Sequence, residues 1–335
     1  MSLVSSAQSP MFLVSNSNAN LYKADTSSGS ISNLGAMSPN TGTMSQCNGL
    51  SVHPCNGEIF VFANHSSSSD RSLMTVDNNG NAELMGDMGD YVASIAFDAQ
   101  GNLYAVTGDG ASNPENLYTV NQSTGAMTFV QSLGNGSDGE VIAYCPDNGK
   151  MYHWSGWDGT LSNLTFESID LNTNAVANVG MTGSVSPTSI RAAAYVGQGY
   201  FLVSHHARGT MALCDTNGLL VATSFSTSVG VKGMAIQTPG ITSPKDGVCP
   251  GDSAVLTASA GSSYQWYFNG SLISGAASQT YTTSAVGYYN CVIQNSICTD
   301  STAGGFFLDS FDLPSVTVTS NDSGFCPGGV VSLTG

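Results

Sequence analysis

Short apolar runs that alternate with turn-forming residues recur along most of this chain. The segment from Ser94 to Val106, SIAFDAQGNLYAV, places two such runs on either side of Gly101, which predicts a tight β-hairpin. The same outline returns as LSVHPCNGEIFVF from Leu50, VIAYCPDNGKMYHW from Val141 and AAYVGQGYFLVS from Ala193. The four turn glycines are spaced by 44, 48 and 50 residues, so this hairpin is the unit of an internal repeat.

A second hairpin follows each copy of the first. Its five versions are LYKADTSSGSI from Leu21, LMTVDNNGNAEL from Leu73, LYTVNQSTGAMTFV from Leu117, ESIDLNTNAVANV from Glu167 and ALCDTNGLLV from Ala212. In each version the first strand ends at a short acidic or amide residue that can accept hydrogen bonds from its own turn: Asp25, Asp77, Asn121, Asp170 and Asp215. Four strands per repeat of about 40 to 50 residues predict the blades of a β-propeller.

The number of second hairpins predicts five blades. The first strand of the unit is missing at the N-terminus, where the chain begins its pattern with MFLVSNS, and it stands unpaired as GMAIQ from Gly233. We therefore predict that the strand at Lys232 to Gln237 completes the blade that begins at Met11 to Gly35. This closure would leave the ring without exposed sheet edges. The predicted propeller spans residues 1–238.

The composition changes at TPGITSPKDG, which is rich in Pro, Gly and Ser and is typical of a linker. The next segment has the strand rhythm of an immunoglobulin-like sandwich. It reads AVLTAS, then YQWYFNG with Trp266 at a core position, then GYYNCVI, where Tyr289 stands two residues before Cys291 as in a tyrosine corner. We assign residues 239–312 to this sandwich. The expected fold class is thus all-β, with a five-bladed β-propeller followed by an Ig-like β-sandwich.

The sandwich segment resembles the Ig-like domains of large surface proteins secreted by gliding and related bacteria (Bacteroidetes type). The resemblance rests on a C-x-G start at Cys249, an aromatic Q-W pair, an N-G turn, a G-x-Y and a late cysteine. It implies a disulfide between Cys249 and Cys298, with Cys291 as a buried thiol. A pair between Cys249 and Cys291 is the alternative.

The opening motif of the sandwich returns near the end of the chain. CPGDSAVLT at Cys249 recurs as CPGGVVSLT at Cys326, 77 residues later. Residues 313–335 are therefore expected to be the truncated start of a second Ig-like repeat, and the polypeptide is expected to be part of a longer tandem-domain chain. The other cysteines are less informative. Cys47 and Cys55 either bridge locally or stay as thiols, and Cys145 and Cys214 are expected to be free thiols in the core.

The charge balance limits the possible partners. Only 9% of residues are charged, and the formal net charge is −16, so phosphate would be repelled and nucleic acid is not expected as a partner. There is no apolar run of about 18 residues, so membrane insertion is not expected. A surface that is acidic and poor in lysine suits a secreted or cell-surface protein.

Candidate ligand-binding residues gather on one predicted face of the propeller. The loops that join the second strand of each blade to the third are longer and more varied than the turns at the other end, and such loops often carry binding residues. The candidates are Trp157, Asp158, His205, His206, Arg208, Arg71, Arg191 and Lys232; His65 lies in the same loops. We expect Trp157 to stack on a sugar ring or an apolar side chain, and Arg208 with the histidines to donate hydrogen bonds. The alternative is that these residues are solvated loop tips.

Catalytic and metal-binding patterns are weak in this sequence. Some five-bladed propellers are glycosidases with carboxylates around the central funnel, and here Asp90, Asp138 and Glu140 lie at its entrances. The sequence has no GxSxG or HExxH motif, and the inner strands carry mostly small apolar residues. The Asp77 turn lacks the late glutamate of a calcium loop. We therefore expect no catalytic residues, no metal and no cofactor.

Taken whole, the chain resembles secreted or cell-surface proteins in which a propeller similar to the YVTN and NHL-like classes precedes Ig-like spacers. The resemblance implies a non-catalytic extracellular adhesion or recognition protein. Its propeller tip would bind a cell-surface glycan or protein, and its Ig-like modules would form a stalk. A structural subunit of an extracellular fibre and a propeller glycoside hydrolase are the alternatives.

Overall fold

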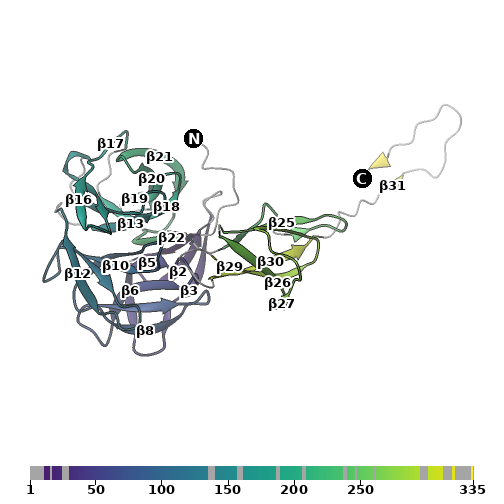
Figure 1. The fold of residues 1–335 in the computed structure, drawn as a ribbon, viewed down its shortest axis with the longest axis horizontal. Coiled ribbons are helices and arrows are strands. Elements are labelled where there is room, and N and C mark those ends of the chain that lie inside the picture. Colours follow the sequence, from purple (N-terminus) through teal and green to yellow (C-terminus); the bar gives the residue numbers. More distant parts are fainter. Residues whose placement is uncertain are drawn as a thin grey trace.

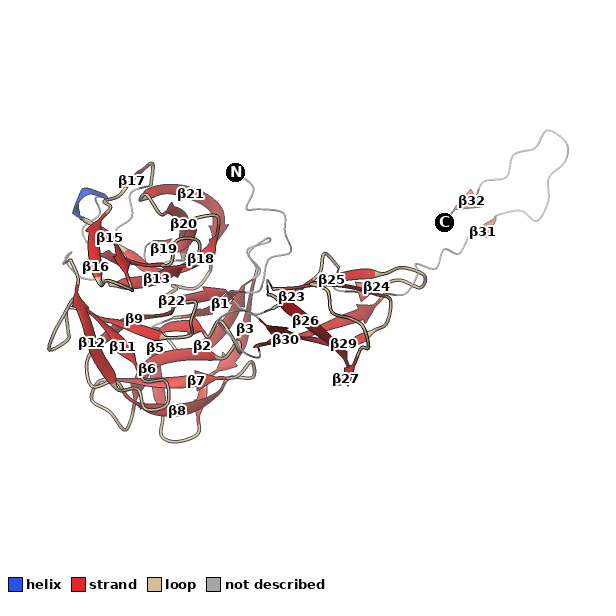
Figure 2. Ribbon diagram, viewed as in Figure 1, coloured by secondary structure: helices blue, strands red, loops and turns tan. Residues whose placement is uncertain are grey.

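A computed structural model of the chain describes residues 11–15, 17–24, 30–134, 140–156, 161–185, 189–205, 209–236, 240–245, 247–259, 261–294, 301–311, 319–320 and 333–334. Within these ranges the regular secondary structure is almost entirely β-strand, and turns and loops connect the strands (Figure 2). The helical content of the described residues is one 3₁₀ turn, η1 (Leu161–Asn163). Among the described residues, no helix is both long enough and apolar enough to cross a membrane.

Residues 11–236 form five sheets of four or five strands (Figure 1). The first sheet contains β22 (Gly233–Ile236), β1 (Met11–Val14), β2 (Asn20–Ala24) and β3 (Ile31–Ala36). The second contains β5 (Met44–Val52), β6 (Ile59–His65), β7 (Arg71–Val76), β8 (Asn81–Asp87) and β4 (Ser38–Pro39). The third contains β9 (Val92–Phe97), β10 (Leu103–Thr107), β11 (Asn116–Val120) and β12 (Met127–Ser132). The fourth contains β13 (Val141–Cys145), β14 (Lys150–Ser155), β15 (Thr165–Asp170) and β16 (Ala175–Asn178), and the fifth contains β18 (Ile190–Gly197), β19 (Tyr200–His205), β20 (Thr210–Asp215), β21 (Leu219–Ser226) and β17 (Thr182–Gly183).

The first strands of these sheets surround a common axis. In cyclic order, β22 contacts β5, β5 contacts β9, β9 contacts β13, β13 contacts β18, and β18 contacts β22. From the axis outward, the four main strands of each sheet pair antiparallel, as the repeated hairpins predicted. The short strands β4 and β17 add to the outer edges of the second and fifth sheets as parallel neighbours of β8 and β21. This arrangement is that of a β-propeller.

The apolar core lies between neighbouring sheets. Five clusters of buried side chains each combine residues from two adjacent sheets around the ring. The cluster between the fourth and fifth sheets is the most aromatic, because Trp154 stacks on Phe166 with ring centroids 4.8 Å apart and meets Phe201 edge-on at 5.2 Å. Each sheet therefore buries both of its faces against its neighbours.

The ring is closed by strands from the two ends of this region. β22 pairs antiparallel with β1, with Met11 opposite Ile236 and Val14 opposite Gly233. This confirms the predicted pairing of the GMAIQ strand with the N-terminal blade. The pairing gives β1 a hydrogen-bonded partner on both of its edges, so neither edge is open to solvent.

The hairpin turns follow the chemistry that the sequence indicated. Asp77 Oδ1 accepts hydrogen bonds from the backbone N–H groups of Asn79 and Asn81, each at 2.8 Å. Equivalent contacts occur at Asn121, Asp170 and Asp215. Asp25 lies outside the described residues. The Asp77 loop is therefore a capped turn.

Residues 241–310 form two further sheets with a core of their own. One sheet contains β23 (Ile241–Thr242), β25 (Ala254–Ala258) and β28 (Thr280–Thr283), and the other contains β24 (Gly247–Val248), β30 (Ser301–Ser310), β29 (Gly287–Gln294), β26 (Ser263–Phe268) and β27 (Ser271–Leu272). Trp266 lies in this core and donates from Nε1 to Ser278 O at 2.9 Å. Tyr289 is also buried, and its hydroxyl donates to Ala285 O at 2.7 Å.

Two short strands near the C-terminal end, β31 (Thr319–Ser320) and β32 (Leu333–Thr334), pair antiparallel. The residues around the predicted boundaries at 238 and 312 lie outside the described ranges, so these boundaries stay predictions.

The cysteines correct one expectation. Cys249 carries a free thiol, so the predicted disulfide between Cys249 and Cys298 is absent from the structure; Cys298 itself lies outside the described residues. The alternative pair with Cys291 is absent as well, because Cys249 follows β24, and β30 separates β24 from the strand of Cys291. Two strand spacings of about 4.8 Å exceed the reach of a disulfide. Cys47 is also free, so it does not bridge to Cys55, and Cys145 and Cys214 are buried thiols as expected.

Candidate functional site

The two ends of the ring differ in their connections. Each inner strand begins at the end where the loop between the second and third strands lies: Val92, at the start of β9, pairs with Thr107, at the end of β10. We call this end the loop face. The opposite end, where the inner strands run into their hairpin turns, is called the turn face.

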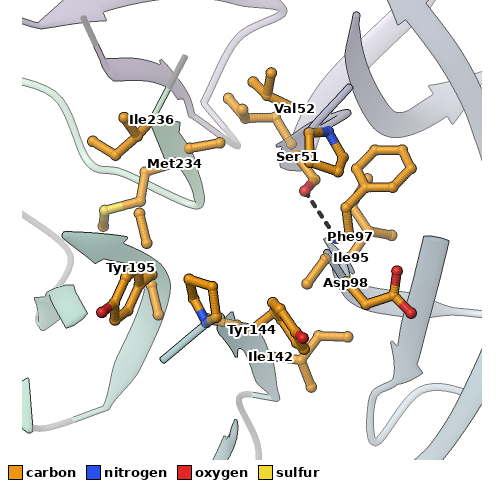
Figure 3. A pocket seen from close by; sticks show the side chains of 18 of the residues that line it. Ser51, Val52, Ile95, Phe97, Asp98, Ile142, Tyr144, Tyr195, Met234 and Ile236 are labelled. Carbon is orange, nitrogen blue, oxygen red and sulfur yellow. Dashed lines mark hydrogen bonds between the residues drawn. The ribbon is translucent and has the colours of Figure 1, made fainter. Parts of the chain in front are cut away.

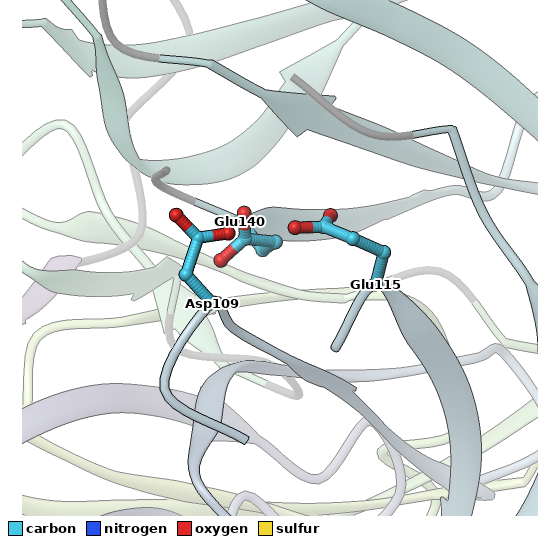
Figure 4. A group of neighbouring side chains, drawn as sticks. All are labelled: Asp109, Glu115 and Glu140. Atoms are coloured by element: carbon cyan, nitrogen blue, oxygen red, sulfur yellow. The ribbon is translucent and has the colours of Figure 1, made fainter. Parts of the chain in front are cut away.

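Three acidic side chains meet on the loop face, between the third and fourth sheets (Figure 4). Asp109 follows β10, Glu115 precedes β11 and Glu140 precedes β13. One carboxylate oxygen from each residue lies within 4.8 Å of the other two. Asp109 is exposed, whereas Glu115 and Glu140 are only 4% and 3% exposed. We call these three residues the carboxylate cluster.

The loop that carries Asp109 and Glu115 is anchored by a fourth carboxylate. Asp90 Oδ1 accepts a hydrogen bond from Ser112 N at 2.8 Å, and its Oδ2 accepts one from Asn113 N at 3.4 Å. The N–H of Gly108 donates to Tyr91 O at 3.0 Å. Asp90 therefore positions the loop and is not itself a member of the cluster.

The backbone holds Glu115 in an unusual conformation. Its φ is +56°, in the left-handed region that side chains other than glycine rarely adopt. Glu115 N donates to Thr107 O at 3.1 Å, and Leu133 N donates to Glu115 O at 2.8 Å. Local strain of this kind persists only where surrounding contacts fix it, and it is common at functional sites.

Glu140 is held from two sides. The hydroxyl of Ser155, at the end of β14, donates to Glu140 Oε1 at 3.4 Å. On the other side the carboxylate lies against Gly108, where an added Cβ would stand 2.8 Å from Glu140 Oε2. A larger residue at position 108 would therefore displace the carboxylate.

Burial dominates the electrostatics of the cluster. It raises the pKa of Glu115 to about 10, and the neighbouring Glu140 carboxylate adds to the effect. Burial also raises the pKa of Glu140. Both carboxylate oxygens of Glu115 are buried and accept no hydrogen bond from the described residues. Close carboxylates cannot all stay ionised without compensation, so this arrangement can hold a proton or a cation.

A second buried polar pair lies on the neighbouring strands of the fourth sheet. His153 Nδ1 and Glu167 Oε1 are 3.0 Å apart, and Gly134 N donates to the same oxygen at 2.7 Å. Burial raises the pKa of Glu167, but the hydrogen bonds from His153 and Gly134 outweigh it and bring this pKa below its usual value. A positive charge on His153 would also lower the pKa of Glu140 and so favour its ionised form.

Four of the eight ligand-binding residues predicted from the sequence lie outside the described ranges: Trp157, Asp158, His206 and Arg208. Arg71 is described and is 4% exposed. Its guanidinium carbon lies 4.2 Å from the centroid of the Tyr91 ring, and Nη1 donates to Asn64 Oδ1. These contacts give Arg71 internal partners within the loop face.

The remaining three predicted residues lie near one another on the loop face. Arg191 is near the start of β18, and Lys232 directly precedes β22, the inner strand that contacts β18. His205 ends β19 opposite Ile190. The ring of His65, by contrast, is bound at both nitrogens, by Thr41 O and Ser67 Oγ, each at 2.7 Å.

Sequence reasoning named one residue of the carboxylate cluster, Glu140, without predicting the cluster itself. It named Glu140 and Asp90 at the funnel entrance but not Asp109 or Glu115, and Asp138 lies outside the described residues. A usable signal was present, because Asp109 and Glu115 flank one loop between paired strands and so must lie at the same end of the third sheet. The approach of Glu140 from the next sheet had no signal in the sequence.

A cavity of about 310 Å³ lies on the ring axis (Figure 3). All five inner strands line it, and the lining includes Ser51, Ile95, Ile142, Ala193 and Met234. The cavity continues to the turn face, since Pro54, Ala99 and Pro146, which follow inner strands, also line it.

Aromatic side chains gather where the cavity reaches the turn face: Phe97, Tyr144 and Tyr195. The Tyr195 hydroxyl accepts a hydrogen bond from Gly199 N at 3.2 Å. The carboxylate of Asp98 is engaged by its own turn, through Gln100 N at 2.9 Å and Asn102 N at 2.8 Å. The lining is thus mainly apolar, with tyrosine hydroxyls near the mouth.

No protein-family model matches the chain, and no curated protein matches it. Solved structures with similarity include a nidogen/laminin complex (8% identity, 68% of this chain and 98% of that chain, TM-score 0.47). Another is a Bacteroides caccae protein of unknown function (9%, 69% and 99%, TM-score 0.43). A third is a Xanthomonas campestris gluconolactonase (13%, 69% and 80%, TM-score 0.42). The fold assignment above rests on the strand pairing of this chain alone.

Proposed function

We propose that this chain is an extracellular recognition protein. A five-bladed β-propeller binds a glycan or protein ligand, and Ig-like modules hold the propeller away from the cell as a stalk. The observation that carries the proposal is the cavity of about 310 Å³ on the ring axis, to which every inner strand contributes side chains. This volume is at the lower end of the range for small-ligand sites.

The chemistry of the cavity favours a compact ligand with apolar faces. Tyr144 and Tyr195 line the cavity and are only partly buried, so their rings can stack on a sugar ring or an aromatic side chain, and each such contact is worth about 1 kcal/mol. The small residues of the inner strands, among them Ala143 and Ala194, leave the space open. We propose this axial cavity as the first candidate ligand site. The second candidate site is the loop face, where Trp157 and Arg208 would contact the ligand.

Three features support the stalk. The two-sheet unit at residues 241–310 buries a tryptophan at the expected core position, and Tyr289 bonds to the backbone four residues upstream, as in a tyrosine corner. The opening motif of this unit returns at Cys326. Secretion or display at the cell surface fits the acidic surface, with a formal net charge of −16.

The test measures binding of the whole chain to immobilised glycans and to surface proteins of neighbouring cells. Replacing Tyr144 and Tyr195 together by alanine is expected to weaken binding about tenfold or more, because two stacking contacts are lost. The matched control replaces Tyr118 and Phe129, an edge-to-face pair on the outer strands of the third sheet. A parallel variant replaces Trp157 and Arg208 by alanine.

The outcomes separate the two faces. Loss of binding in the Tyr144/Tyr195 variant alone supports the axial cavity, and loss in the Trp157/Arg208 variant alone moves the site to the loop face. Unchanged binding in both variants would contradict the proposed recognition role at the axial cavity and at the loop face.

One observation bears on a glycoside hydrolase as a second candidate. Glu115 and Glu140 are close and have raised pKa values, as a catalytic acid requires. Both side chains, however, are at least 96% buried, so a glycosidic oxygen would not reach them in this conformation. Hydrolysis of chromogenic glycosides that disappears in Glu140→Gln would favour this candidate over non-catalytic recognition.

A further inference from the structure

We propose that the carboxylate cluster binds a divalent cation, with calcium as the ion that fits best. The site would join the third sheet of the ring, which supplies Asp109 and Glu115, to the fourth, which supplies Glu140. It is separate from the axial cavity, which none of these residues lines, and it does not depend on the proposed function.

The spacing of the oxygens matches a cation of this size. Calcium binds oxygen ligands at about 2.3 to 2.6 Å, so two ligands on opposite sides of the ion lie about 4.6 to 5.2 Å apart. In the cluster, one oxygen from each carboxylate lies within 4.8 Å of the other two. Figure 4 shows the three side chains converging from separate segments of chain.

The strongest indication is the side chain of Glu115. It is 96% buried, both of its carboxylate oxygens lack a hydrogen-bond donor among the described residues, and it points towards Glu140 (Figure 4). Burying a carboxylate without a partner is costly, and the neighbours it faces here are themselves carboxylates. A divalent cation would satisfy the oxygens of both residues together.

The surrounding contacts hold the ligands in place before an ion arrives. Backbone hydrogen bonds at Thr107 and Leu133 fix Glu115, and the hydroxyl of Ser155 supports Glu140. Gly108 leaves the space that the Glu140 carboxylate occupies. A site that is already arranged loses little conformational entropy on binding, which favours affinity.

The donor set favours calcium over softer metals. The cluster contains carboxylate oxygens and neither histidine nor cysteine, which is the ligand type of calcium and magnesium. Asp109 is exposed, so its side of the site is open to water molecules that would complete the six to eight oxygens that calcium takes. Magnesium demands a shorter and more regular octahedron.

The experiment uses the whole chain after removal of metal with EDTA and dialysis. Titration with calcium chloride in a calorimeter is expected to show one ion per chain. Calcium at about 100 times its dissociation constant is expected to raise the Tm of the ring by roughly 5 to 10 °C, because the ion binds the folded state alone.

Three variants test the ligands. Glu115→Gln and Glu140→Gln keep the side-chain shape and are expected to weaken calcium binding at least 100-fold, and the Tm should no longer respond to calcium. Asp109→Asn alters an exposed side chain, so folding is not at risk, and it is expected to weaken binding about tenfold. The matched controls are Glu83→Gln, on β8 of the second sheet, and Glu58→Gln, an exposed carboxylate just before β6 of the same sheet.

No heat of binding at 10 mM calcium, together with an unchanged Tm, would overturn the proposal. Equal binding by wild type, Asp109→Asn and Glu115→Gln would overturn it too, because the ion would then lie elsewhere. Unchanged calcium affinity in the two control variants supports it. If the buried variants fail to fold, a tenfold loss in Asp109→Asn supports the site, and no loss in that variant contradicts it.

Discussion

At the scale of single residues, two buried glutamates, Glu167 and Glu115, differ in whether hydrogen-bond donors surround their carboxylates. Glu167 has such donors, because His153 and the N–H of Gly134 bond to its Oε1 at 3.0 and 2.7 Å. Glu115 has no such donor among the described residues. The pKa shifts follow this difference, since the pKa of Glu167 lies below the ordinary value and that of Glu115 lies far above it.

The hydrogen bonds of Glu167 predict an acid-dependent loss of stability. Because its pKa is lowered by folding, the ionised side chain stabilises the native state above the unfolded-state pKa of about 4.3, and this contribution is lost as pH falls through the lower folded-state pKa. Glu167→Gln is expected to reduce the free energy of unfolding by about 1 to 3 kcal/mol at pH 7. Urea unfolding between pH 7 and pH 3 measures the difference, which should shrink below pH 4. A difference independent of pH would contradict this account.

Burial also lowers the reactivity of the core cysteines, because it raises the pKa of their thiols. It raises the pKa of the Cys47 and Cys214 thiols to about 12 and that of Cys291 to about 11, so almost no thiolate forms near neutral pH. Cys249 carries a free thiol that is only partly buried.

We predict that iodoacetamide at pH 8 modifies Cys249 in the folded protein within minutes and leaves Cys47, Cys214 and Cys291 unmodified. Peptide mass spectrometry after brief labelling provides the measurement, and a sample unfolded in urea gives the control in which all four react. Protection of Cys249 in the folded chain that disappears on reduction would show that it forms a disulfide after all.

At the scale of elements, the hairpins were predictable and their assembly into a ring was partly so. Alternating apolar residues and Asp or Asn turns are local signals. The predicted hairpins pair as expected, and the turn residues that lie within the described ranges, Asp77, Asn121, Asp170 and Asp215, accept hydrogen bonds from their own turns. The β22–β1 pairing was predicted because one strand was missing at one end and one was spare at the other. The carboxylate cluster was not predicted, because its ligands come from loops of two different sheets.

The inner strands approach one another closely at two glycines. A Cβ at Gly233 on β22 would lie 2.6 Å from Gly49 Cα and 2.5 Å from Leu50 N on β5. Gly233→Ala is therefore expected to destabilise the ring by about 1 to 3 kcal/mol or more, because backbone atoms on β5 would have to move. The control is Gly89→Ala, where φ is +75° and no atom lies within 4 Å of the added Cβ, so only backbone strain of about 1 kcal/mol applies. Thermal unfolding compares them; equal losses would argue against the close approach.

At the scale of the whole molecule, residues 11–236 and residues 241–310 form two units that share no core residue. The five apolar clusters of the ring consist of residues between 11 and 236. The cluster of the two-sheet unit consists of residues between Ile241 and Leu308. Each unit therefore has the buried area to fold alone.

We predict that the fragments 1–240 and 241–312 each unfold cooperatively, with Tm values within about 3 °C of the matching transitions in the whole chain. Differential scanning calorimetry of the fragments and of the whole chain measures this. The ring transition should respond to calcium in the fragment 1–240 as in the whole chain. A fragment that fails to fold would show that the two units depend on each other.

The sequence by itself determined the strands, their turns, the repeat and the pairing that closes the ring, because these depend on side-chain alternation and on turn residues a few positions apart. It also located the core tryptophan and tyrosine of the sandwich. Only the tertiary structure decided that Arg71 lies against Tyr91, that Cys249 is a free thiol, and that Asp109, Glu115 and Glu140 share one site. The physical reason is that these contacts join segments from different strands and sheets, and their distances depend on how the sheets pack around the axis.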